Sequence, residues 1–202
     1  MGREARCRAI INGEATEGTA YLETDAVVLR GEVRAVIPYR DMAEVQAESG
    51  RLTIEHSGGT ALFELGEEAE LWAHRIRNPK TLVDKLGIKP DHKVVVLRVE
   101  DDGFLEQLRV RGARVVTRAT GDADAIFFGA RRRADLGRLD RLKSYLKPDG
   151  ALWVVRRKGG GPITENEVMA GGKEAGLVDV KVVRFSETHT AEKFVIPVAE
   201  RR

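Results

Sequence analysis

The chain has 202 residues, of which 42% are hydrophobic and 33% are charged, the composition of an ordinary globular protein with one or two domains. No apolar run approaches the roughly 18 residues that a membrane-spanning helix needs, and the first residues do not lead into a signal-peptide core. The single cysteine, Cys7, excludes an internal disulfide and a cysteine-based metal cluster, so we expect a cytoplasmic protein.

The distribution of charge divides the chain near residue 80. Residues 1–79 contain nine arginines, no lysine and fourteen acidic residues, whereas residues 80–202 contain all ten lysines and carry a net positive charge. The change coincides with Asn78-Pro79, a pair that favours the end of a helix. We therefore predict two domains, 1–79 and 80–202.

The first domain is predicted to be all-β. Short apolar segments alternate with turn residues, and Asn12-Gly13 is a strong hairpin signal. A helix should follow, because Leu65, Ala69, Trp72 and Ile76 form one apolar stripe, with Trp72 filling the end of a barrel. The predicted strands cover residues 6–11, 18–22, 26–29, 33–39, 42–47, 52–56 and 61–65.

Seven strands and a closing helix resemble the PH/GRAM-like domains. The likeness rests on residues 18–29 and 37–45. Members that bind phosphoinositides need basic residues in the first hairpin loop, but residues 12–18 here are acidic. The resemblance therefore implies a PH/GRAM-like β barrel with a C-terminal capping helix and a scaffold or interaction role.

The second domain is predicted to alternate strands and helices. Strands are expected at residues 93–99, 114–117, 124–128 and 151–155, with an amphipathic helix at 135–146 and a terminal hairpin of residues 180–186 and 193–198. A tight turn is expected at residues 148–150. Thr164 and Glu167 form a capping box for the last helix, where Gly171-Gly172 indicates close packing or a break.

This order resembles class I S-adenosylmethionine methyltransferases, whose "L-K-P-G-G-x-L-x-V" segment corresponds to residues 146–154. The resemblance implies a Rossmann-like domain, trimmed between Thr117 and Asp124, where a helix–strand–helix unit has no room. The same half resembles an uncharacterised bacterial family of unknown function through residues 82–90, 121–124 and 149–153, which implies no activity.

The cofactor elements that the methyltransferase resemblance implies are altered. The segment after the first strand, residues 98–104, has one glycine, Gly103, where a glycine-rich turn is needed. The second strand ends in Thr117-Arg118, where an acidic residue should hold the ribose hydroxyls. We therefore expect no cofactor, with S-adenosylmethionine as the alternative.

Cationic residues follow four consecutive predicted strands, and ligands of open α/β sheets bind at the carboxyl ends of strands. A triple glycine ahead of a helix adds free backbone N–H groups. We predict an anion-accepting cleft there, with no catalytic residue, and no metal site because the histidines are scattered. The candidate ligand-binding residues are Arg98, Asp102, Gly103, Arg118, Arg131, Arg132, Arg156, Arg157, Gly159, Gly160, Gly161 and His189.

Three functions remain open from the sequence. The first is a non-catalytic binding or regulatory protein whose partner is an anionic small molecule or a protein. The second is a divergent S-adenosylmethionine-dependent methyltransferase that uses the same cleft. The third is binding of nucleic acid through the arginine-rich edge, since arginines neutralise backbone phosphates.

Overall fold

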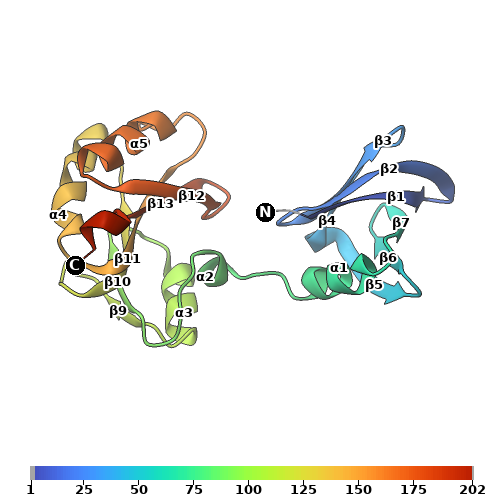
Figure 1. Ribbon diagram of the computed structural model, residues 1–202, viewed down its shortest axis with the longest axis horizontal. Helices are drawn as coiled ribbons and strands as arrows, with labels where there is room; N and C mark the ends of the chain where they lie inside the picture. Colours follow the sequence, from blue (N-terminus) through green and yellow to red (C-terminus); the bar gives the residue numbers. More distant parts are fainter. Residues whose placement is uncertain (1–2, 202) are drawn as a thin grey trace. The chain divides into compact units, whose positions relative to one another are not determined.

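The computed structural model describes residues 3–201, and the chain divides into two compact units, one ending at Lys80 and one beginning at Thr81 (Figure 1). No helix in the described residues is long and apolar enough to cross a membrane. The first unit is a nearly closed antiparallel barrel in the order β4-β3-β2-β1-β7-β6-β5. Its elements are β1 (Arg3–Ile11), β2 (Glu14–Leu22), β3 (Ala26–Gly31), β4 (Ala35–Pro38), η1 (Tyr39–Asp41), β5 (Met42–Glu48), β6 (Arg51–His56), β7 (Gly59–Glu64) and α1 (Glu68–Arg77).

The barrel follows the sequence pattern closely. Asn12 and Gly13 both have positive φ, 52° and 87°, as the predicted hairpin turn requires. The Asn12 side chain also accepts from Thr60 N at 2.9 Å and donates to Gly58 O at 3.1 Å, joining two loops. Trp72 is fully buried in the barrel core, with Ala69 and Ile76 on the same face of α1, as the apolar stripe predicted.

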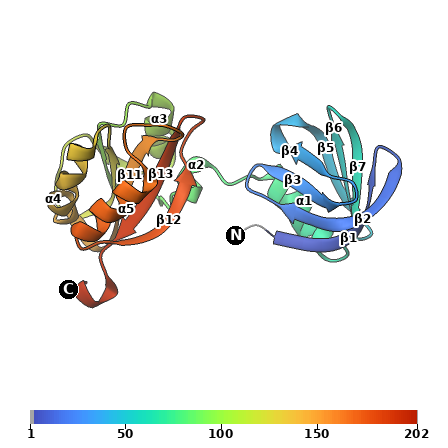
Figure 2. The same ribbon diagram turned by 90° about the horizontal axis from the view of Figure 1, so that it is seen from above.

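The second unit is built on a mixed, Rossmann-like sheet in the order β12-β13-β11-β10-β8-β9 (Figure 2). Strands β9, β8, β10 and β11 are parallel, and the terminal hairpin of β12 and β13 is antiparallel, as predicted. The strands are β8 (Lys93–Leu97), β9 (Arg114–Val116), β10 (Ala123–Gly129), β11 (Leu146–Arg157), β12 (Val178–Arg184) and β13 (His189–Val195). The helices are α2 (Leu82–Lys85), α3 (Asp102–Val110), η2 (Arg133–Arg138), α4 (Leu139–Lys143), α5 (Glu165–Glu174) and η3 (Val198–Glu200).

Helices cover both faces of this sheet, which explains its nearly continuous apolar strands. Val94 and Val96 of β8 pack with α2 and α3 on one face, whereas Val95 packs with α4 and α5 on the other. The predicted close packing at the two glycines of α5 is confirmed. A Cβ on Gly172 would lie 2.2 Å from the Phe194 ring, and one on Gly171 would lie 3.0 Å from Leu136.

Two local predictions are wrong. Residues 148–150 do not form a tight turn. They lie in extended backbone within β11, and the strand bulges there, since Ala123 pairs with Leu146 but Ala125 pairs with Ala151. Pro148 has no N–H for the ladder, and Gly150 lies close to the Ala123 carbonyl, where a Cβ would be 2.7 Å away.

The helix predicted at residues 135–146 is also shorter and mixed. It is a 3₁₀ segment, η2, followed by the short helix α4. The Asp135 carboxylate binds the backbone N–H groups of Arg131 and Arg132, and Gly137 has low helix propensity. Both features oppose a regular α-helix at this start.

Candidate functional site

The site lies where the order of the parallel strands reverses. From β8 the chain passes to β9 on one side, and then returns to β10 on the other side. The carboxyl ends of β8 and β10 therefore flank a topological switch point, which is where open α/β sheets bind ligands. The backbone at the end of β10 lies close to the backbone after β8: a Cβ on Gly129 would lie 2.1 Å from the Arg98 carbonyl oxygen.

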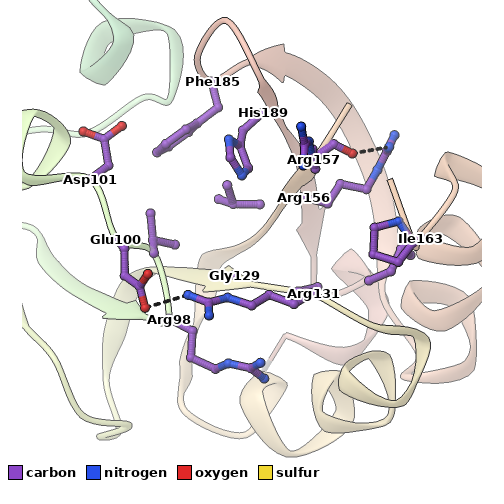
Figure 3. Close-up of a pocket in the computed structure, with 14 residues that line it drawn as sticks. Arg98, Glu100, Asp101, Gly129, Arg131, Arg156, Arg157, Ile163, Phe185 and His189 are labelled. Carbon is purple, nitrogen blue, oxygen red and sulfur yellow. Dashed lines mark hydrogen bonds and ion pairs between the residues drawn. The ribbon is translucent and has the colours of Figure 1, made fainter. Parts of the chain in front are cut away.

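A cavity of about 370 Å³ opens at this edge (Figure 3). Residues at or just beyond the carboxyl ends of β8, β10 and β11 form its walls, together with the loop before α5 and the β12–β13 hairpin. Its lining combines apolar, basic and acidic side chains. The lining residues are Arg98, Val99, Glu100, Asp101, Gly129, Ala130, Arg131, Val155, Arg156, Arg157, Pro162, Ile163, Phe185 and His189.

Five of the predicted ligand-binding residues meet here, namely Arg98, Arg131, Arg156, Arg157 and His189. Gly159 lines a neighbouring, more open hollow that also contacts Arg156. The remaining predicted residues line neither space: Asp102, Gly103, Arg118, Arg132, Gly160 and Gly161. The structure therefore assembles part of the predicted set.

Arg118 and Gly103 lie outside the cavity for clear local reasons. Arg118 is exposed beyond the short strand β9, and Gly103 is in the first turn of α3. The N-terminus of α3 is already capped, because the Asp101 carboxylate accepts from Phe104 N at 2.8 Å. This cap, rather than a glycine-rich turn, sets the path of the chain after β8.

Two cavity arginines are paired with carboxylates that the sequence interpretation did not connect to them. Arg98 Nη1 lies 2.6 Å from Asp135 Oδ1, and Arg131 Nη2 lies 2.6 Å from Glu100 Oε1. Burial would raise the pKa of Asp135, but hydrogen bonds from Arg98 and from two backbone N–H groups outweigh it and lower the pKa to about 2. Asp135 therefore holds a full negative charge next to the cavity.

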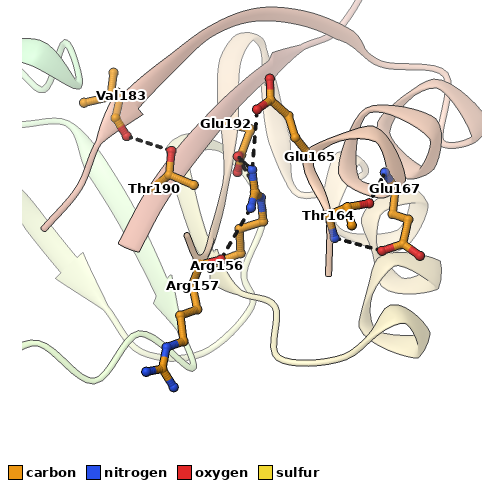
Figure 4. A network of polar contacts seen from close by, with 8 residues as sticks. All are labelled: Arg156, Arg157, Thr164, Glu165, Glu167, Val183, Thr190 and Glu192. Atoms are coloured by element: carbon orange, nitrogen blue, oxygen red, sulfur yellow. Dashed lines mark hydrogen bonds and ion pairs between the residues drawn. The ribbon is translucent and has the colours of Figure 1, made fainter. Parts of the chain in front are cut away.

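A third arginine is paired in the interior (Figure 4). Arg156 Nη2 lies 2.8 Å from Oε1 of Glu192, which is fully buried, and 3.8 Å from the exposed Glu165. Burial raises the pKa of Glu192, and the attraction of Arg156 only partly opposes this effect. The second oxygen of Glu192 has no hydrogen-bond partner among the described residues.

Arg157 differs from the other three arginines. Its guanidinium forms no ion pair with a carboxylate within residues 3–201. It lies opposite His189 in the β11–β13 register, and both residues line the cavity. The His189 Nδ1 atom is 2.9 Å from Thr188 Oγ1, while no partner of Nε2 is found in the described chain. Arg157 and His189 are thus the groups available to an anionic part of a ligand.

The cavity also has an acidic side. Glu100 and Asp101 line it at the turn after β8, and Phe185, Pro162 and Ile163 contribute apolar surface. The run Glu100-Asp101-Asp102 was visible in the sequence, but its position in the cavity depends on the path of the turn. Phe185 and Ile163 come from segments remote from β8 in the chain, and no local signal marked them.

Comparisons with known proteins establish no family for the chain. No protein-family model matches it, and no curated protein matches it. Among solved structures, a SAM-dependent methyltransferase from Aquifex aeolicus is similar at TM-score 0.48 and 16% identity, over 59% of this chain and 90% of that one.

Two further structures are similar over part of the chain. A TehB-like SAM-dependent methyltransferase from Corynebacterium glutamicum has TM-score 0.43 and 13% identity, over 64% of this chain and 96% of that one. CalO1, a methyltransferase in calicheamicin biosynthesis solved with SAH bound, has TM-score 0.46 and 16% identity, over 64% of this chain and 58% of that one. Values this low carry no argument about activity, so the functional case rests on the site.

Proposed function

We propose that the second unit binds a small ligand carrying both negative and positive charge in the cavity beside the switch point, and that S-adenosylmethionine is this ligand. The observation that carries the proposal is the mixed lining of the cavity. Glu100 and Asp101 lie at the turn after β8, and Arg157, which forms no ion pair within residues 3–201, lies at the end of β11. A purely anionic ligand would meet these carboxylates, because most of the arginine charge is already neutralised.

The chemistry of the lining fits S-adenosylmethionine in size and charge. A volume of about 370 Å³ is within the usual range for small-molecule sites. Arg157 and His189 would hold the carboxylate, Glu100 and Asp101 would accept hydrogen bonds from the ammonium group or the ribose hydroxyls, and Phe185 would contact the adenine. When bound, S-adenosylmethionine supplies an electrophilic methyl group.

The residues of this chain act by binding and by excluding water. The turn after β8 lies against Gly129, so the ligand would be enclosed by backbone and by apolar side chains rather than by a glycine-rich loop. Thr117 and Arg118, at the end of β9, are exposed and outside the cavity. The ribose would therefore depend on Glu100 and Asp101.

A non-catalytic binding protein is the second candidate, and it is favoured because no carboxylate of the described residues pairs with Arg157. In that case a simple carboxylate or phosphate would bind through Arg157 and His189 without any methyl transfer. Nucleic-acid binding through Arg131 and Arg132 remains a prediction. Arg131 is in an ion pair with Glu100, which reduces the charge available to a phosphate.

Thermal unfolding with added ligand separates the first two candidates. A Trp72→Phe background leaves Trp153 as the only tryptophan, so its fluorescence reports the second unit. S-adenosylmethionine and S-adenosylhomocysteine should both stabilise it, by about 2.7 kcal/mol at 100 times the Kd. Stabilisation by citrate or phosphate alone would favour the anion-binding candidate, and no stabilisation by either S-adenosyl compound would refute the proposal.

A variant that fills the cavity tests whether the S-adenosyl compounds bind there. Val99 lines the cavity and is only partly buried, so Val99→Trp should occupy the space while leaving the sheet intact. Ligand-dependent stabilisation should disappear in Val99→Trp. If the variant retains it, the S-adenosyl compounds bind elsewhere.

A further inference from the structure

A second cationic cluster lies away from the cavity, in one row across the sheet. The strand registers place Phe127, Trp153, Lys193 and Lys181 side by side on β10, β11, β13 and β12. Phe127 stacks on Trp153 with ring centroids 5.9 Å apart. The Nζ atoms of Lys181 and Lys193 lie 5.7 Å and 5.8 Å from the centroid of the indole ring. Since β11 separates β10 from β13, the lysines approach Trp153 from the side opposite Phe127.

The two lysines repel each other. They are direct partners across an antiparallel pair, an arrangement in which like charges are destabilising. Neither lysine forms an ion pair with a carboxylate in the described chain. Burial lowers the pKa of Lys193, and the charges of Lys181 and Arg201 lower it further. The cluster therefore holds two ammonium groups for which residues 3–201 supply no carboxylate partner.

The cluster also contains a buried donor without an acceptor. Trp153 is fully buried, and its indole N–H has no hydrogen-bond partner in the part of the chain described. Lys181 Nζ donates to the Lys85 carbonyl oxygen at 2.7 Å, which fixes this ammonium group near the end of α2. Lys193 Nζ has no acceptor among the described residues. Unsatisfied buried donors are rare enough to require an explanation.

We propose that Lys181 and Lys193 form a binding site for the phosphate group of a small molecule. A tetrahedral oxyanion offers several acceptor oxygens, so it accepts from two ammonium groups at once and replaces their repulsion by attraction. The cation–π contacts with Trp153 hold both ammonium groups in place before binding. None of these residues lines the cavity at the carboxyl edge, so the site is separate from the S-adenosylmethionine site.

The test is a fluorescence titration of the Trp72→Phe protein, because an anion at the two ammonium groups alters the surroundings of Trp153. Inorganic phosphate and ribose 5-phosphate are titrated separately, at constant ionic strength maintained with chloride. The proposal predicts saturable binding of at least one of them, weakened about tenfold or more by Lys193→Met or Lys181→Met. Methionine keeps an apolar stem over the indole. Lys173→Met, on α5, is the matched control and should bind as the parent does.

The titrations with inorganic phosphate and with ribose 5-phosphate show whether the site binds the free ion or a phosphate ester. Tighter binding of ribose 5-phosphate indicates a phosphate ester, and equal binding indicates the free ion. Saturable binding that is unchanged in Lys193→Met and Lys181→Met would overturn the proposal, as would the lack of saturation by either compound. A single-stranded oligonucleotide is titrated as a third ligand. Saturable binding of the oligonucleotide alone would also overturn the proposal, since the occupant would then be a polymer.

Stability provides an independent readout. Without phosphate, Lys193→Met should unfold at a urea concentration equal to or above that of the parent, because a repulsion is removed. With phosphate, the parent should gain stability and Lys193→Met should not. A Lys193→Met protein that is destabilised without phosphate and still gains from phosphate would contradict the assigned role of Lys193.

Discussion

Arg98 Nη1 donates a 2.6 Å hydrogen bond to Oδ1 of the buried Asp135, and this contact joins the turn after β8 to the turn after β10. Oδ2 of Asp135 accepts from the backbone N–H groups of Arg131 and Arg132. One carboxylate thus fixes both turns beside the switch point. Arg98 also has a positive φ of 58°, uncommon for a residue with a side chain, so its backbone depends on such support.

Asp135→Asn should destabilise the second unit in a pH-dependent way. The folded pKa of Asp135, about 2, is below its ordinary value of 3.8, so its contribution is complete above pH 3.8 and is lost as the pH falls toward 2. The shift corresponds to about 2 kcal/mol at pH 7. Urea unfolding of Asp135→Asn at pH 7 and near pH 2 checks this, with the exposed Asp140→Asn as control. An equal loss at both pH values would show that charge is not the cause.

Gly172→Ala should destabilise the second unit by about 1–3 kcal/mol, because the added methyl group would overlap the Phe194 ring. Gly137→Ala is the matched control. A Cβ there meets no other atom within 4 Å, and Gly137 has no positive φ, so this variant should be neutral or slightly stabilising. Thermal unfolding of both variants compares them, and equal stability would contradict the packing at α5.

The buried pair of Arg156 and Glu192 should contribute little net stability. Arg156→Met alone leaves Glu192 as an unpaired buried acid and should cost about 3–5 kcal/mol at pH 7. The double variant Arg156→Met with Glu192→Leu should recover most of that loss, because it removes both desolvated charges. Urea unfolding of the single variant and of the double variant compares their free energies of unfolding. A double variant no more stable than Arg156→Met would show that the pair is required as a unit.

Asp101 has two roles, as the N-terminal cap of α3 and as a negative charge in the cavity, and two substitutions of it distinguish these roles. Asp101→Asn keeps a side-chain oxygen for Phe104 N, so stability should change little while affinity for S-adenosylmethionine falls. Asp101→Ala should lose affinity and about 1 kcal/mol of stability. Calorimetric titration and thermal unfolding of both variants check these outcomes. Full affinity in Asp101→Asn would exclude a role for this negative charge.

Local patterns predicted the elements that frame the site. The capping box is present as expected: Glu167 N donates to Thr164 Oγ1, and Thr164 N donates to Glu167 Oε2. Backbone contact from Thr164 and the ion pair with Arg133 lower the pKa of Glu167 to about 2. Such motifs span three residues, so the sequence alone specifies them. The strand-end arginines were located in the same way, from the ends of apolar runs.

The pairing of charges could not be predicted. Asp135 follows Arg98 by 37 residues, and Glu192 follows Arg156 by 36, so only the folded sheet brings the partners together. The sequence therefore indicated an excess of positive charge at this edge, whereas the structure neutralises most of it. The bulge in β11 was missed for a related reason, since Pro148 and Gly150 are usual in turns and the ladder with β10 depends on tertiary pairing.

Calorimetric titration with S-adenosylmethionine of the parent protein, of Arg157→Met and of Arg118→Met shows whether the cavity binds this ligand. Arg157 lines the cavity and Arg118 does not. We expect saturable binding to the parent and to Arg118→Met, and binding weakened about tenfold or more in Arg157→Met, as the loss of one charge-assisted hydrogen bond implies. No binding to the parent, or an equal loss in both variants, would contradict the proposed site.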